Sequence, residues 1–509
     1  MFKRILAIAL AVGLGAWVVS SCNSSKTVTT PPTGTVAAFI GDVPFCSVLS
    51  YRSTITGLTL TPVGGGSPVS IFVVSAAITP LIKVDFGELR DFSTPLVFGS
   101  VPPGTYNQAT ITFSSPEIVV FDPSVASPIQ ITFPSQSNTP PTFTIEPPLT
   151  VASGLVSGLN IDFNMRQSIA LDQQGNVTGN VTPTMTFTPV SAGATNGFGE
   201  MDDLKGFVTS VTSTGSTTGS GFTGGFGFQT LSGTAPLFSV NLTSSTQICG
   251  PTTVSNQTCT PIALNQLLTG SFLEMDGYVD SSGNMIAKTI EVEDREIVEQ
   301  NQLALIGSVI SVARDVNGNV TQFNFYVNEE EPDDEFSIPL DSIVVVNLSS
   351  STIYQFSSRA TNFASLPVDA TALAPGQELV VHGVFTVPAA GATPPPAVPL
   401  PVTVAADKVY VKLQSYQGSF SSLVAAQSDD KTGAFWMASC GVLFQGAPIL
   451  VLTDGQTAFV GLTGLGALTP QPALLVKGLV FFELQGGTVN GVTVPPRTLV
   501  LLAKQVHQL

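Results

Sequence analysis

The chain has 509 residues, of which 10% are charged and 43% are hydrophobic, whereas roughly a quarter of an ordinary soluble domain is charged. Its 47 Gly and 37 Pro interrupt the chain too often for long helices, and the apolar content argues against intrinsic disorder. The formal net charge of −17 argues against a nucleic-acid partner, because few cations are available to neutralise phosphates. At about 100–200 residues per domain, the length predicts about three to five domains.

The first residues have the pattern of an export signal. Lys3 and Arg4 form a short basic region, and an apolar run from Ile5 to Val19 follows. That run is shorter than the ~20 residues that a membrane-spanning helix needs, and it fits the core of a signal peptide. We predict a signal peptide over residues 1–21 and a polar, extended tether over residues 22–33.

The signal ends in Val19-Ser20-Ser21-Cys22, which resembles the lipobox of bacterial lipoproteins. In that family a branched apolar residue and two small residues precede an obligatory Cys, so the resemblance implies that Cys22 carries the lipid. Asn23 stands where an Asp would mark inner-membrane retention, which by resemblance to sorting in Gram-negative bacteria favours the outer membrane. We expect a lipid-anchored protein of the outer membrane that faces the periplasm or the cell surface. An ordinary secreted protein with an incidental Cys is the alternative.

Four cysteines remain in the exported chain, which meets a compartment that permits disulfides. Cys249 and Cys259 enclose a short stretch rich in turn-forming residues, and we predict that they bridge a loop between strands. Cys46 and Cys440 lie in different predicted domains, and the sequence leaves open whether they are free or paired. No Cys has CxxC spacing or a His nearby in the sequence, so a zinc site is unsupported.

Residues 34–198 show short strands with polar turns. Between Ser53 and Thr61, Thr alternates with apolar residues at period two, as in a half-buried strand, and Ala109–Phe113 repeats the pattern. The segment Val101–Tyr106 reads as a turn that feeds a strand, with the Tyr at the edge of the core. These features predict a domain of short, half-buried β-strands joined by polar turns.

The order of Ile40-Gly41-Asp42-Val43-Pro44, the Thr-alternating strand and the Pro-Pro-Gly-Thr-Tyr turn resembles an uncharacterised bacterial family, domain of unknown function 4382. The usual opening of that family is close to Leu-Thr-Asp-Ala-Pro, from which this chain departs. The Pro-Gly-x-Tyr turn also recurs in transthyretin-like and other immunoglobulin-like sandwiches, so the resemblance implies that architecture. The family has no established activity to transfer.

From residue 204 onward the chain repeats itself three times. Each repeat has a Gly-containing strand, a segment that ends in Thr, a strand centred on Gly and a closing strand that carries Lys. The segments are Leu204–Val211, Val240–Thr246, Leu273–Val279 and Ala287–Ile290; Leu305–Val312, Val346–Thr352, Leu379–Phe385 and Asp407–Tyr410; and Tyr416–Leu423, Val451–Thr457, Leu474–Val480 and Ala503–Val506.

We predict that each repeat is a small closed or nearly closed β-barrel of the oligonucleotide-binding type in topology only, with the central Gly at a bend of the strand. The repeats resemble a second uncharacterised bacterial family, domain of unknown function 5666, in their Gly-x-Val start and Ala-x-Lys-Ile end. The expected boundaries are 204–296, 303–413 and 414–509. The fold class is therefore all-β: an immunoglobulin-like or transthyretin-like sandwich followed by three small β-barrel repeats, strung as an arm.

The densest charge in the chain is an acidic run that could ligate Ca²⁺ through carboxylate oxygens. Its spacing matches no defined calcium loop, so we expect a solvated hairpin tip and no metal or cofactor. Asp315–Asn319 resembles the start of a calcium loop, but Val320 stands at position six where Gly is required, and a hairpin turn explains the segment better. The acidic run consists of Glu329, Glu330, Glu331, Asp333, Asp334 and Glu335.

Catalytic motifs are scarce. The chain has two His, of which His382 lies inside a predicted strand and His507 lies near the C-terminus, and no serine-hydrolase, zinc-protease or phosphate-loop motif occurs. We expect a non-catalytic cell-envelope lipoprotein with a structural, adhesion or ligand-binding role. The sequence does not identify its partner, which could be an envelope protein or a polysaccharide. The alternatives are an exported hydrolase that uses a pair of carboxylates, and a calcium-dependent adhesin that uses residues 329–335.

Overall fold

The computed structural model describes residues 32–508 apart from short internal segments. The predicted signal peptide, Cys22 and nearly all of the tether lie outside the described residues, as do Cys46, Cys440 and Asp333–Glu335. The segments left out are 44–47, 74–81, 88, 90–92, 115, 123–126, 132–139, 174–176, 214–220, 231–236, 251–258, 295–301, 332–340, 357–367, 387–401, 440–441, 445, 470–472 and 490.

The N-terminal domain, called the sandwich below, is an 11-stranded sheet that folds into two layers over one core. The strands follow the order β5-β1-β10-β13-β9-β6-β2-β7-β8, and β3 and β4 pair with β2. A short helix, α2 (Met165–Ser168), and a hairpin of β11 (Ile169–Leu171) and β12 (Val177–Val181) complete it. The strands of the sheet are β1 (Gly34–Val43), β2 (Val48–Pro62), β3 (Val69–Val73), β4 (Ile82–Asp85), β5 (Ser93–Val101), β6 (Gly104–Phe113), β7 (Glu117–Asp122), β8 (Ser127–Ile131), β9 (Thr142–Val151), β10 (Val156–Asn164) and β13 (Met185–Val190).

Two predicted features of the sandwich are present. Along β2 the threonines are half-buried while Ile55, Leu58 and Leu60 are fully buried, as the period-two pattern predicts. Tyr106 is buried at the start of β6, where its hydroxyl donates a hydrogen bond of 2.7 Å to the carbonyl oxygen of Pro102. The predicted turn therefore anchors its strand to the core as expected.

Each of the three repeats is a closed barrel of five strands, and the predicted fold class is confirmed. Barrel 1 contains β14 (Glu200–Ser213), β15 (Phe222–Thr230), β16 (Phe238–Gly250), β18 (Phe272–Val279) and β19 (Met285–Asp294). Barrel 2 contains β20 (Gln302–Arg314), β21 (Val320–Glu331), β22 (Ile343–Asn347) with β23 (Ile353–Phe356), β24 (Glu378–Thr386) and β25 (Thr403–Val411). Barrel 3 contains β26 (Gln414–Ala426), β27 (Gly433–Ser439), β28 (Pro448–Thr453) with β29 (Ala458–Val460), β30 (Ala473–Glu483) and β33 (Thr498–Gln508).

The three barrels share one topology. In each, the first strand pairs antiparallel with the second and the fourth, and the fifth strand runs antiparallel to the fourth. The fifth strand also pairs in parallel with the third, which closes the barrel. This is the five-stranded Greek-key order of the oligonucleotide-binding fold. Between the third and fourth strands each barrel has a short 3₁₀ turn: η1 (Leu264–Gln266), η3 (Ala370–Ala372) or η5 (Leu465–Ala467).

The repeated glycine of the fourth strand has a steric reason. The strand register shifts at Gly277, Gly383 and Gly478, so each barrel bends there as the sequence predicts. A Cβ at these positions would lie 2.4, 2.4 and 2.0 Å from a carbonyl oxygen of the fifth strand. No side chain fits at that distance, and only Gly allows the two backbones to approach so closely.

The repeated threonine forms the same hydrogen bonds in every barrel. The hydroxyls of Thr246, Thr352 and Thr457 accept from a backbone N–H three residues earlier, at 2.9, 3.0 and 2.9 Å. They donate to the carbonyl oxygens of Ala287, Ala406 and Ala503 on the fifth strand, at 2.7, 2.8 and 2.9 Å. Each threonine therefore ties the turn of the third strand to the fifth strand and helps to close the barrel.

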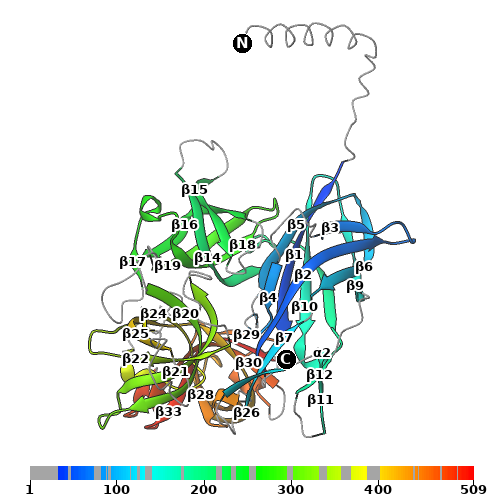
Figure 1. Cartoon of the computed structure of the whole chain (residues 1–509). Helices are drawn as coiled ribbons and strands as arrows, with labels where there is room; N and C mark the ends of the chain where they lie inside the picture. The colour runs from blue at the N-terminus through cyan, green and yellow to red at the C-terminus, as the bar shows by residue number, and fades with distance from the viewer. Residues whose placement is uncertain are drawn as a thin grey trace, which may run out of the picture.

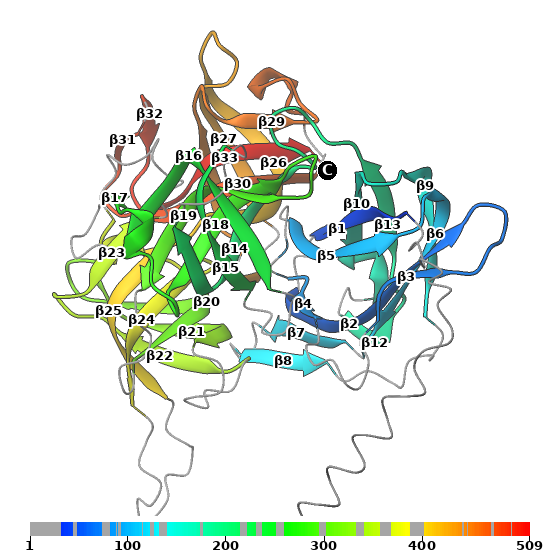
Figure 2. The same ribbon diagram turned by 90° about the horizontal axis from the view of Figure 1, so that it is seen from above.

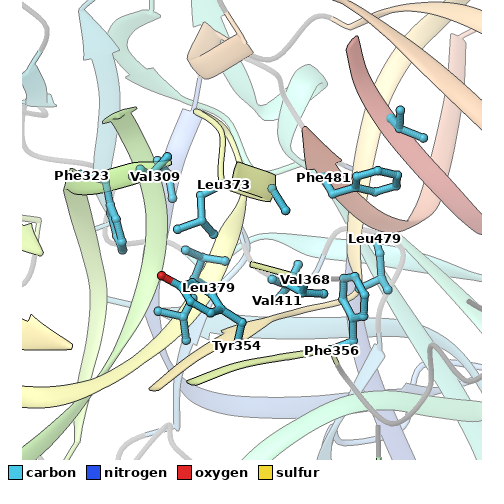
Figure 3. Packing of buried hydrophobic residues seen from close by; sticks show 14 of the residues in the cluster. Val309, Phe323, Tyr354, Phe356, Val368, Leu373, Leu379, Val411, Leu479 and Phe481 are labelled. Atoms are coloured by element: carbon cyan, nitrogen blue, oxygen red, sulfur yellow. The ribbon is translucent and has the colours of Figure 1, made fainter. Parts of the chain in front are cut away.

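The expectation that the barrels form an extended arm is wrong. The barrels gather beside the sandwich (Figures 1 and 2) and share hydrophobic clusters with it and with one another. Phe356 and Leu373 of barrel 2 share one buried cluster with Leu479 and Phe481 on the outer wall of barrel 3 (Figure 3). Apolar outer walls cannot stay in water without cost, so the barrels pack together.

Neighbouring clusters join the remaining domains. Ala37 and Phe39 of β1 pack with Phe198 and Met201 at the start of barrel 1, so β1 is buried on both faces. This double burial explains why the segment from Val36 to Ile40 is an unbroken apolar run. Within the described residues, no helix is both long and apolar enough to cross a bilayer.

We expect Thr457→Val to destabilise barrel 3 by about 1–3 kcal/mol, because the backbone N–H of Asp454 and the carbonyl of Ala503 lose their buried partner. Urea unfolding followed by the fluorescence of Trp436, the one Trp that follows the predicted signal peptide, measures the change. The exposed Thr493→Val of the same barrel is the matched control and should change stability by less than ~0.5 kcal/mol. Equal effects of the two substitutions would contradict the role given to the repeated threonine.

Candidate functional site

Buried charge is concentrated where the barrels meet. The buried Asp, Glu, His and Lys side chains of the described residues are Asp42, Glu274, Asp276, Glu291, His382, Lys412 and Lys477, and all but Asp42 belong to the barrels or to the link between barrels 2 and 3. Charged groups are rarely buried unless they are paired, so we expect these side chains to have partners of opposite charge nearby. We call Asp202, Glu274, Glu291, Lys412 and Lys477 the barrel junction.

Strand alternation turns the acids of barrel 1 outward. Leu273 and Met275 of β18 belong to the interior of barrel 1, so Glu274 between them faces away from that interior. On β19, Ile290 and Val292 point inward, and Glu291 therefore shares the outer face with Glu274, directly opposite it. Barrel 1 thus presents two adjacent carboxyl groups to its neighbours.

The matching cations come from barrels 2 and 3. Lys412 lies in the two-residue link between β25 and β26, and its ammonium group contacts the carboxylate of Glu274. Lys477 of β30 reaches Asp202 of β14, with 2.5 Å between Nζ and Oδ2. The side chains of Lys412 and Glu274 are 4% and 2% exposed, and those of Lys477 and Asp202 are 3% and 22% exposed. Opposite charges on different barrels therefore fix their relative positions.

A second polar contact joins the sandwich to barrel 2. Arg52 of β2 donates to Asp341 at 2.8 Å and to the carbonyl oxygen of Asn328 at 3.2 Å, and its Nε lies 3.4 Å from Asp85. The hydroxyl of Tyr326 donates to the other oxygen of Asp341 at 2.6 Å. Asp85 is held in turn by the Ser50 hydroxyl at 2.7 Å and by the backbone N–H of Tyr51 at 2.9 Å.

These contacts keep Arg52 charged and Tyr326 protonated. Burial disfavours the charged guanidinium, but the carboxylates of Asp85 and Asp341 outweigh this effect and raise the pKa of Arg52 above its ordinary value. Burial, and then the charge of Asp341, raise the pKa of Tyr326 well above its ordinary value. Asp341 has φ of 66°, a left-handed conformation that is uncommon outside Gly and places its carboxylate between Arg52 and Tyr326.

The residues singled out from the sequence do not meet in one place. A disulfide joins Cys249 to Cys259 at the edge of barrel 1, between β16 and the short β17 (Thr260–Pro261). Glu329–Glu331 form the end of β21, and the rest of the acidic run lies outside the described residues. Over the part of the chain that is described, no three His, Cys, Asp or Glu side chains are grouped so that they could hold a metal ion.

Asp315 acts as a turn former. Its carboxylate accepts hydrogen bonds from the backbone N–H groups of Asn317 and Asn319, at 2.8 and 2.9 Å, and from the side chain of Asn319 at 3.1 Å. The side-chain bond from Asn319, together with the backbone bonds, lowers the pKa of Asp315. A carboxylate occupied by these donors has the Asx-turn geometry of a hairpin, which agrees with the interpretation favoured by the sequence.

Sequence reasoning missed the barrel junction and Arg52. These charged residues are spread along the chain from Arg52 to Lys477, and no local spacing connects them. One signal was available, since Lys477 stands within a strand that is otherwise almost wholly apolar. In a chain with so few charges, a lone charge in such a strand needs a partner.

A family model matches the N-terminal domain. Residues 33–183 match the family model described as Domain of unknown function (DUF4382), which confirms the resemblance expected for the sandwich. One solved structure, titled "drosophila Unr CSD456", is 9% identical, with 60% of this chain and 97% of that chain covered. Its TM-score of 0.14 is too low to indicate a shared fold. The search of curated proteins gives no match.

We expect Asp341→Asn to destabilise the contact between the sandwich and barrel 2 by about 1–3 kcal/mol, because Arg52 loses one of its two charged partners. Thermal unfolding and limited proteolysis of the whole chain measure the loss. The matched control is Asp407→Asn, which removes an exposed carboxylate from the same barrel and should leave both readouts unchanged. A result in which the control and the variant behave alike would contradict the role assigned to Arg52.

Proposed function

We propose that the protein is a non-catalytic, lipid-anchored scaffold of the bacterial cell envelope, in which four domains form one rigid body for adhesion or ligand binding. The observation that carries the proposal is the set of buried charged contacts between domains, Lys412 with Glu274 and Lys477 with Asp202. A buried charge that loses its partner destabilises a protein by about 3–5 kcal/mol, so separating the barrels is costly. Such a body keeps its surfaces at fixed distances.

The sequence supplies the location in this proposal. The resemblance of Val19–Cys22 to a lipobox supports a lipid on Cys22, and β1 begins at Gly34, directly after the predicted tether. The sandwich is then the domain attached directly to the tether, and the barrels lie beside it. By resemblance we also assign the three barrels to domain of unknown function 5666. Asn23 favours the outer membrane as the site of anchoring.

The rigid arrangement predicts a compact particle in solution. For the lipid-free Cys22→Ser chain we expect a radius of gyration near the ~23 Å of a compact chain of this length. Small-angle X-ray scattering measures it, and the value should not rise with salt up to about 0.5 M, because the junction pairs are buried and poorly screened. A much larger radius, or a radius that grows with salt, would support a flexible arm.

The anchoring prediction has a direct test. We expect cells that express the natural chain to incorporate an alkyne-tagged fatty acid into it, and the protein to sediment with the outer membrane. Cys22→Ser should abolish the label and release the protein, because the thiol that accepts the lipid is gone. Cys46→Ser is the matched control and should keep both the label and the location. Absence of the label from the natural chain would contradict the prediction that the protein is a lipoprotein.

A further inference from the structure

The contact between Lys412 and Glu274 differs from the other ion pairs that join domains. Both side chains are almost completely buried, with 4% and 2% exposure, and they come from different barrels. By contrast, Lys477 pairs with an aspartate that is 22% exposed, and Arg52 and Asp341 are 15% and 20% exposed. Lys412 and Glu274 therefore meet in a place from which water is largely excluded, while the other pairs keep some access to it.

A second acid lies opposite Glu274. Glu291 is directly opposite Glu274 in the β18–β19 register and is 3% exposed. Side chains opposite one another in an antiparallel pair lie about 4.5–5.5 Å apart at Cβ. Two carboxyl groups at that separation in a buried place can hold one proton between them. The site thus combines an amine, a carboxyl group that it contacts, and a neighbouring acid that can carry a proton.

We propose that Lys412 and Glu274 become joined by an intramolecular amide bond, which links barrel 1 covalently to the connection between barrels 2 and 3. The uncharged amine of Lys412 adds through Nζ to Cδ of Glu274 in its acid form. The bond from Cδ to one carboxyl oxygen then breaks, and that oxygen leaves as water with one proton from the amine and its own proton. Glu291 takes the proton from nitrogen and returns one to the leaving oxygen. No electron transfer or external reagent is involved.

The physical environment favours the amide over the ion pair. In water, hydrolysis of such an amide is driven by the hydration of the ammonium and carboxylate that it releases. In the barrel junction those charges would be poorly hydrated, and burying them costs several kcal/mol per ion. The amide is neutral, and the water that forms can leave the protein. Folding therefore supplies both the proximity of the reacting atoms and the reason for the product to persist.

This inference goes beyond the proposed function and does not depend on the lipid anchor. The test is peptide mapping of the unfolded, reduced natural protein by trypsin digestion and tandem mass spectrometry. We expect a branched peptide that contains both Glu274 and Lys412, lighter than its two component peptides by one water. Trypsin should fail to cleave after Lys412, because an acylated lysine is not its substrate. Recovery of only the two separate, unmodified peptides would overturn the proposal.

Substitutions at the reacting residues, and in the other junction pair as a control, test which residues form the amide. Lys412→Arg keeps the positive charge but cannot form this amide, so the branched peptide should vanish while Trp436 fluorescence reports a folded chain. Lys477→Arg, the matched control in the other junction pair, should leave the branched peptide unchanged. Glu291→Gln should lower the fraction of linked chains, since the proton carrier is lost. A branch that persists in Lys412→Arg, or one that maps to Lys477 and Asp202, would contradict the assignment.

Discussion

The exclusion of water from the contact between Lys412 and Glu274 is the constraint on which the arrangement of domains depends. Glu274 and Lys412 are tolerated there because each provides the other with the partner that solvent no longer supplies. Their pairing requires the outer face of β18 to meet the link between β25 and β26. Once that meeting is fixed, barrel 3 has little freedom, because the link has two residues and Leu413 within it is buried.

Inside each barrel, two local contacts between strands determine which residues are needed. Two backbone strands approach closely at Gly277 and its equivalents, and a threonine hydroxyl joins the third strand to the fifth. These local demands explain why a loose sequence repeat preserves a Gly and a Thr while its loops differ. Barrel 3 has in addition a hairpin, β31 (Gly487–Val489) with β32 (Val492–Val494), whose valines join the cluster shared with barrel 2.

Much of this fold could be predicted because its determinants are local. Alternation along β2, the turn before Tyr106 and the repeated glycines each depend on neighbours in the sequence. The packing of the barrels could not be predicted, since it depends on which outer walls are apolar once every strand has been assigned an inward face. The partners Arg52 and Asp341 are separated by 289 residues, and only the folded chain brings them together.

The position of the two terminal strands has a mechanical consequence. β1 lies between β5 and β10, and β33 lies between β30 and β28 with β29, so each is hydrogen-bonded along both edges. A pulling force applied through the chain ends would act along these strands and load whole rows of hydrogen bonds together. It would not peel an edge strand away one bond at a time. Strands held along both edges therefore resist a force applied along their length better than an edge strand would.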